Sequence, residues 1–282
     1  MLKPITYTSI LTVALAAFAT AEPTRLPEPA QTMITGRSDL RALHESSYTG
    51  PMRTTLTREN KYPDAGNGDG TIGFRREADD NLTETGISIF EASGRLSVGH
   101  NLTLGASVPF VDTDRSGDDE MGIGDIKLHA DLLAFQDIFR FPFIIPYLEV
   151  ALPTGDEDKG LGTGETVITA GISIGTKVYD ALTYVIDAAY HVDGAQDFMG
   201  DAADIYSLSG SLLWDISDRF AVLAEGRIFE KLDGMSSTPT EALGGLAYSI
   251  GRESSFTARG GQSKAGNGET ADIVMLDFTL GF

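Results

Sequence analysis

The sequence contains no cysteine, so no disulfide bond holds the fold, and its stability must come from burial and backbone pairing. Basic residues are scarce: 21 Lys and Arg stand against 41 Asp and Glu, giving a formal net charge of −20. This sign disfavours a nucleic-acid partner, because phosphate backbones are bound by basic surfaces. After its first residues the chain also lacks any run of about 18 apolar residues, which excludes a helical membrane protein.

The N-terminal residues have the pattern of an export signal. Lys3 precedes a short apolar run, and small residues follow it near Ala21. Such a run is too short to span a membrane and is typical of a secretory signal peptide. We therefore expect a signal peptide at residues 1–21, a short N-terminal periplasmic and irregular segment at residues 22–68, and the folded domain at residues 69–282.

Most of the remaining chain alternates in polarity with a period of two, as β-strands with two different faces do. In the last segment, Val274–Phe282, apolar side chains fall on every even position and Asp277 lies on the odd row. The same parity recurs in segments of roughly 10 to 13 residues, longer than the ~5 to 6 residues usual for soluble strands. The odd rows of these segments contain the charged and imidazole side chains Glu91, Arg95, Asp125, Lys127, His129, Asp131, Glu149, Asp187, His191, Glu225, Arg227, Arg259 and Asp277.

Strand length and connections decide between a soluble sandwich and a membrane barrel. Short and long connections alternate along the chain, as the periplasmic turns and outer loops of outer-membrane barrels do. The sequence therefore predicts an all-β protein, a transmembrane antiparallel up-and-down β-barrel of about 12 strands in a bacterial outer membrane. The even row would meet lipid and the odd row the lumen. Gly70–Asp79 is the weakest strand, because Arg76 is charged at an even position.

The odd-row charges admit two interpretations. A barrel of ~12 strands is narrow enough for side chains to fill much of its interior, and buried charges need partners. The charges could thus only pair with one another, or they could also line a permeation path for a small-molecule solute. We treat them as pore-lining candidates and leave both alternatives open.

An acidic stretch, DTDRSGDDE, has part of the spacing of a calcium-binding loop. Four oxygen-bearing residues occupy the first, third, fifth and ninth positions of an EF-hand-like pattern: Asp112, Asp114, Ser116 and Glu120. The twelfth position is Ile123, where an EF-hand has glutamate. We expect residues 112–121 to be a turn-rich outer loop, with a calcium site there as the alternative and no other cofactor.

Three segments resemble a known family. They are LTLGASVPFVDTD, MGIGDIKLHADLL and PYLEVALPTGDEDKGLGTGETVITAGISIGTKV, and they are similar to segments of outer-membrane transporters of the meta-pathway of phenol degradation. The resemblance implies a small barrel that admits hydrophobic or aromatic compounds. The terminal Phe282, at the end of an alternating strand, resembles the signal recognised by the barrel assembly machinery, which would be one partner; outer-membrane lipids and lipopolysaccharide would be others.

Two other classes of function compete with a channel. A structural or adhesin-like barrel needs no permeation path, but the outer loops are short for a binding head. A lipid-modifying enzyme needs a nucleophile and a histidine where lipid can reach them. No histidine lies on the even rows of the expected strands and no Gly-x-Ser-x-Gly motif is present there, so we expect no enzyme.

Overall fold

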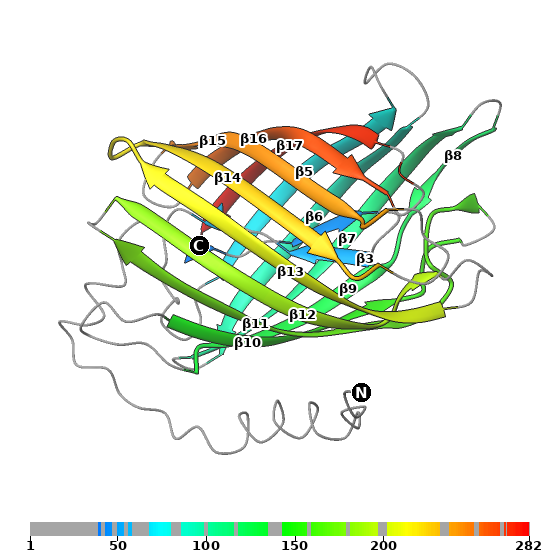
Figure 1. The fold of residues 1–282 in the computed structure, drawn as a ribbon, viewed down its shortest axis with the longest axis horizontal. Coiled ribbons are helices and arrows are strands. Elements are labelled where there is room, and N and C mark those ends of the chain that lie inside the picture. The colour runs from blue at the N-terminus through cyan, green and yellow to red at the C-terminus, as the bar shows by residue number, and fades with distance from the viewer. Residues whose placement is uncertain are drawn as a thin grey trace.

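Twelve antiparallel strands close into a barrel in the computed structural model of the chain (Figure 1). The structure describes short stretches between residues 39 and 57 and most of residues 68–281, with gaps at 80–85, 99–100, 116–117, 135–142, 157–158, 179–180, 197–201, 232–236, 251–253, 266–267 and 269. The predicted fold class is confirmed. Among the described residues, no helix has the length and hydropathy needed to cross a membrane.

The barrel strands follow one another around the ring in chain order. They are β5 (Gly68–Asp79), β6 (Gly86–Val98), β7 (Leu102–Arg115), β8 (Asp118–Ile123), β9 (Ile126–Leu132), β10 (Phe143–Leu152), β11 (Val167–Val178), β12 (Leu182–Gln196), β13 (Ala202–Asp215), β14 (Phe220–Phe229), β15 (Thr240–Ser249), β16 (Ser254–Lys264) and β17 (Thr270–Gly281). β8 and β9 both pair with β7 and count as one interrupted strand. Pairing of β17 with β5 closes the ring, so no strand of the wall is left as an edge.

Each strand turns one row of side chains outward and one inward. Large apolar residues at even positions are exposed, among them Ile72, Leu128, Ile186 and Leu208. Charged residues at odd positions are buried; Lys127, for example, is 1% exposed. Because the wall is a single layer, a charged side chain that is buried within this chain must point into the lumen. The sequence-based assignment of the two rows therefore holds in the described barrel strands other than β8.

The segment expected as the outer loop 112–121 is instead mostly strand. β7 continues to Arg115 and forms a hairpin with β8, which extends past its neighbours at one end of the barrel (Figure 1). Between β8 and β9, a β-bulge at Gly124 inserts one residue, and the Gly124 N–H donates to the Pro109 carbonyl oxygen at 2.9 Å. A bulge exchanges the two faces of a strand. As a result, the side chains of the odd-numbered residues Met121 and Ile123 point outward.

Aromatic side chains mark both ends of the outward-facing apolar band. At the end with the short connections lie Trp214, Phe220, Tyr248 and Phe256, with the Phe220 and Tyr248 ring centroids 5.1 Å apart. At the other end, Tyr190 and Tyr206 stack at 4.7 Å and Phe74 and Phe90 at 4.8 Å. Arg76 lies on the outward face two residues beyond Phe74, where its Nη1 donates to the Ser88 hydroxyl at 2.9 Å. Its even position therefore does not put a charge inside the apolar band.

Four short strands precede the barrel. β1 (Asp39–Leu40) pairs with β4 (Leu56–Thr57), and β2 (Leu43–Ser46) pairs with β3 (Gly50–Arg53). β3 lies against β12. Part of the segment expected to be periplasmic and irregular thus forms strands that contact the barrel. The domain boundaries drawn from the sequence stay a prediction, and the expected signal peptide lies outside the described residues.

Candidate functional site: the barrel lumen

Twelve of the thirteen charged or imidazole residues predicted from the odd rows lie on the less exposed face of their strands, and Asp125 is buried between β8 and β9. Lys127 and Glu149 are each 1% exposed and His191 is 2% exposed. A buried charge loses its hydration and persists only with partners. The described contacts supply those partners, and they differ from one part of the wall to another.

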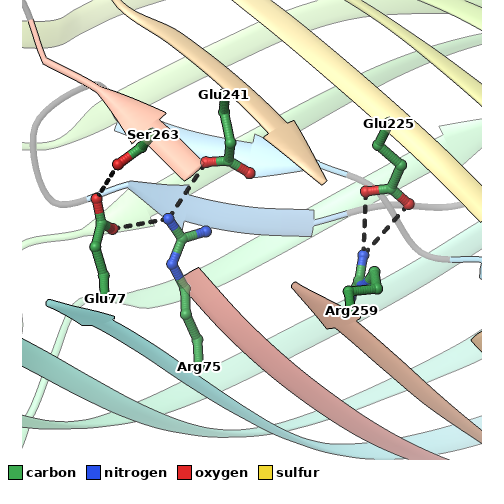
Figure 2. A network of polar contacts seen from close by, with 6 residues as sticks. All are labelled: Arg75, Glu77, Glu225, Glu241, Arg259 and Ser263. Atoms are coloured by element: carbon green, nitrogen blue, oxygen red, sulfur yellow. Dashed lines mark hydrogen bonds and ion pairs between the residues drawn. The ribbon is translucent and has the colours of Figure 1, made fainter. Parts of the chain in front are cut away.

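Arg75 is the centre of one ion-pair network (Figure 2). Its Nη2 lies 2.8 Å from Glu77 Oε2 and 3.3 Å from Glu241 Oε2. The Ser263 hydroxyl donates to the other oxygen of Glu77 at 2.5 Å. Arg75 is on β5 and Glu241 on β15, with β16 and β17 between them, so this contact crosses two strands on the inner surface.

Arg259 is the centre of a second network. Its Nη1 lies 3.3 Å from Glu225 Oε2 (Figure 2). Its Nη2 lies 2.5 Å from Asp277 Oδ2. The three residues come from β16, β14 and β17. Beside them Arg227 stacks on the Phe229 ring, with its Cζ 5.5 Å from the ring centroid. A cavity of about 10 Å³, room for about one water molecule, is lined by Ser209, Glu225, Arg227, Glu241 and Leu243.

Across the lumen, Asp187 accepts two hydrogen bonds from hydroxyl groups. The Tyr147 hydroxyl on β10 donates to Asp187 Oδ1 on β12 at 3.0 Å, and the Ser173 hydroxyl on β11 donates to Asp187 Oδ2 at 2.6 Å. Two ion pairs lie at the β6 side of this region: Lys127 Nζ is 3.8 Å from Glu91 Oε2, and Arg95 Nη2 is 2.5 Å from Asp69 Oδ2 on β5. The described hydrogen bonds to Asp187 thus come from neutral donors.

His191 is held between two hydroxyl groups in the same part of the wall. Its Nδ1 lies 2.9 Å from Thr169 Oγ1, and its Nε2 lies 2.8 Å from Ser207 Oγ. Each hydroxyl both donates and accepts, so the pair is compatible with either tautomer. A buried histidine with two satisfied nitrogens is a positioned polar group of the lining.

Asp125 has a different role from the other predicted residues. Its carboxylate accepts from the backbone N–H of Gly155 at 3.0 Å and from the N–H and hydroxyl of Thr163 at 2.7 and 2.8 Å. Thr154 adds to this connection, since its hydroxyl donates to the Gly124 carbonyl oxygen at 2.8 Å. Asp125 thus anchors the long β10–β11 connection to the bulge, and Leu161 of that connection is buried. Sequence reasoning did not foresee this use.

Of the four calcium candidates, the structure describes the side chains of two, Asp112 and Glu120. Asp112 stands opposite Met121 in the β7–β8 hairpin, and Glu120 lies 3.4 Å from Lys159 Nζ in an ion pair. The Asp114 side chain and Ser116 lie outside the described residues. No cluster of three acidic or histidine side chains suited to a metal occurs in the part of the chain that is described. Phe282 also lies outside it, and its role in assembly stays a prediction.

Several lumen residues are missing from the sequence-based list, notably Arg75, Glu77 and Glu241. All three are at odd positions, so the parity rule extended to β5 and to the start of β15 would have included them. Tyr147 and the hydroxyls around Asp187 are different. Nothing in a local pattern shows that they meet across a strand.

The chain is similar to known barrels in both sequence and fold. The family described as "Putative MetA-pathway of phenol degradation" matches residues 62–271, more than half of the chain. No curated protein is significantly similar to it. An outer membrane channel from Pseudomonas putida F1 superposes with a TM-score of 0.56 at 14% identity, covering 79% of this chain and 97% of that one.

Two porins have the same barrel architecture. NanC porin gives a TM-score of 0.56 at 10% identity and covers 76% of this chain and 98% of its own. KdgM porin, solved in complex with disordered oligogalacturonate, gives a TM-score of 0.51 at 11% identity. The match covers 75% of this chain and 99% of the KdgM chain. At these identities the likeness concerns the fold. A closed 12-stranded barrel with an outward apolar band is an outer-membrane architecture.

Proposed function

The chain belongs to the phenol-degradation family named above, and from this premise we propose that it is an outer-membrane channel for small aromatic or hydrophobic solutes, without enzymatic activity. The observation that carries the proposal is the inner surface of a closed barrel, where strands from β5 to β17 contribute charged or hydroxyl side chains beside apolar clusters such as Val185, Leu213 and Leu223. A barrel that only anchors a structure in the membrane has no need of so many buried charges, each of which is costly to desolvate.

The chemistry of the lining favours small neutral solutes over anions. Arg75 and Arg259 each contact two carboxylates, so their charge is already matched inside the protein. Carboxylates such as Asp187 accept hydrogen bonds, which suits a solute that carries a hydroxyl group on an aromatic ring. The narrow bore of a ~12-stranded barrel restricts passage to small molecules. The proposed surroundings are outer-membrane lipids and lipopolysaccharide, with the barrel assembly machinery as the insertion partner.

The absence of cysteine makes a direct test simple. Ser209 lies on the inward row of β13 and lines the cavity beside Arg227, whereas its neighbour Leu208 is exposed on the outward face. In planar bilayers, a charged water-soluble thiol reagent should lower the single-channel conductance of Ser209→Cys and leave that of Leu208→Cys unchanged. An unmodified barrel that carries no current, or equal responses of both variants, would refute the channel.

A further inference from the structure

Two inward-facing glycines lie under large polar side chains of the lumen. Gly171 on β11 stands opposite Tyr147 on β10, and Gly105 on β7 stands opposite His129 on β9. Both pairs lie on the inner surface, where Tyr147 and His129 are 4% and 5% exposed. Glycine within a strand is unfavourable for stability and marks a site of close approach. At Gly171 and Gly105, the group that closely approaches the glycine is the side chain of the residue opposite it.

The closest contacts at Gly171 are made by the Tyr147 side chain. A Cβ added at position 171 would lie 2.8 Å from Tyr147 Cε1 and even closer to Cζ and Oη, and these are the three nearest atoms. The ring therefore occupies the volume that any other side chain would fill. It extends across β11 and reaches Asp187 on β12 with its hydroxyl. Tyr147 thus lies along the wall instead of pointing toward the barrel axis.

Gly105 has the same relation to His129. A Cβ there would overlap Nε2 and Cε1 of the imidazole, and it would also lie 2.9 Å from the Gly94 carbonyl oxygen. Because a backbone atom is involved, a substitution at this position affects the wall as well as the ring. Gly171 is consequently the cleaner test of what the glycines do.

We propose that Gly171 and Gly105 set the width of the lumen by seating Tyr147 and His129 flat against the barrel wall; the proposal rests on the proposed channel function. With a Cβ at position 171, β10 and β11 remain joined by their backbone ladder, so the ring is the part that moves. The barrel wall blocks movement outward. The ring therefore turns inward, where an aromatic side chain narrows the path and alters the conductance.

The outward glycines provide a matched control. Gly244 lies on the lipid face of β15, and its nearest neighbour to an added Cβ is the Leu223 carbonyl oxygen at 3.9 Å, an ordinary contact. Gly244→Ala therefore adds the same methyl group to a strand interior without touching a lumen side chain. Both substitutions also remove the same backbone freedom from the unfolded chain.

The experiment compares single-channel conductance of the full chain in planar bilayers. Gly171→Ala should lower it about twofold or more, because the displaced ring enters a narrow pore, and Gly244→Ala should leave it unchanged. The double variant Gly171→Ala with Tyr147→Ala should restore or exceed the original conductance, which a merely structural role of Gly171 would not allow.

Failure of the two proposals can be told apart. If the unmodified barrel carries no current, the proposed channel function is refuted, and the proposed role of the two glycines in setting the pore width is refuted with it. A conducting barrel in which Gly171→Ala matches Gly244→Ala, or in which removal of the Tyr147 ring gives no recovery, overturns only the role of the glycines. If Gly171→Ala does not assemble, Gly105→Ala is compared with the double variant Gly105→Ala with His129→Ala. Conductance that is lowered in the single variant and restored in the double variant supports the proposal, and no recovery refutes it.

Discussion

The two sides of the lumen hold their polar groups by different means. On the arginine wall, formed by the inward faces of β14 to β17 and β5, guanidinium groups join carboxylates across one or two intervening strands, as Arg75 joins Glu241. On the acid wall, formed by the inward faces of β6 to β12, hydroxyl groups of Tyr147, Ser173 and Thr169 supply most of the described contacts. Ion pairs thus make most of the described contacts of the arginine wall. Hydroxyl hydrogen bonds make most of those of the acid wall, where Arg95 and Lys127 also form ion pairs.

The two walls differ less in charge than in contacts. Among the described residues, the arginine wall has three fixed cations, Arg75, Arg227 and Arg259, and five carboxylates, Asp69, Glu77, Glu225, Glu241 and Asp277. The acid wall has two fixed cations, Arg95 and Lys127, and five carboxylates, Glu91, Asp125, Asp131, Glu149 and Asp187. A low-dielectric wall around an excess of one sign concentrates its field. A solute in the lumen therefore meets more carboxylates than fixed cations on both sides, with an excess of two on the arginine wall and three on the acid wall.

The largest expected effect comes from breaking the arginine wall. Arg259→Met leaves Glu225 and Asp277 without their described cation, and loss of one partner of a buried ion pair costs about 3 to 5 kcal/mol of unfolding free energy. Lys264→Met on the same strand is the control, because Lys264 is exposed. Urea unfolding in lipid vesicles measures both. Equal midpoints for the two variants would show that the charges on this wall are not coupled.

The next effect tests the premise that both walls face inward while the even row meets lipid. Leu128→Arg places a charge on the outward face between the inward Lys127 and His129, and arginine at the membrane midplane costs about 2 to 4 kcal/mol. Leu128→Ala loses apolar area without adding charge and should assemble nearly normally. Heat-modifiable gel mobility scores the folded fraction. Normal assembly of Leu128→Arg would contradict the orientation of the rows.

A smaller effect is expected on the acid wall. Tyr147→Phe removes one hydroxyl donor from Asp187 and retains the Ser173 contact, so the loss should be about 1 kcal/mol of unfolding free energy. Tyr184→Phe, at an outward position that is 40% exposed, should cost less. The same unfolding measurement separates them. A loss for Tyr147→Phe as large as that for Arg259→Met would remove the distinction between the walls.

The row to which each residue belongs was predictable from the sequence, and most contacts within a row were not. Alternation with a period of two is a local property of a strand, so it assigns Leu128 outward and Lys127 inward without knowledge of the partners. The pairing of Arg75 with Glu241 depends on the closure of β17 on β5 and on the stagger of the strands. Neither is encoded in a single segment.

The region around Gly124 shows where the local pattern fails. One inserted residue exchanges the faces of β8, so the parity rule gives the wrong side for Met121, and the acidic segment expected as a loop continues as a hairpin. The same bulge presents Asp125 to the long β10–β11 connection, whose Gly155 and Thr163 bind its carboxylate. Asp125, which was expected to line the pore, thus also holds a loop, and its pore-lining role stays a prediction.

If the proposed channel function is right, a water-filled, negatively biased path runs between the two walls. Reversal potential across a salt gradient, recorded with the unmodified protein in a planar bilayer, tests it most directly. We predict steady conductance with preference for small cations, reduced in the double variant Asp131→Asn with Glu149→Gln, because both residues belong to the acid wall. Absence of conductance, or preference for anions in the unmodified protein, would contradict the account.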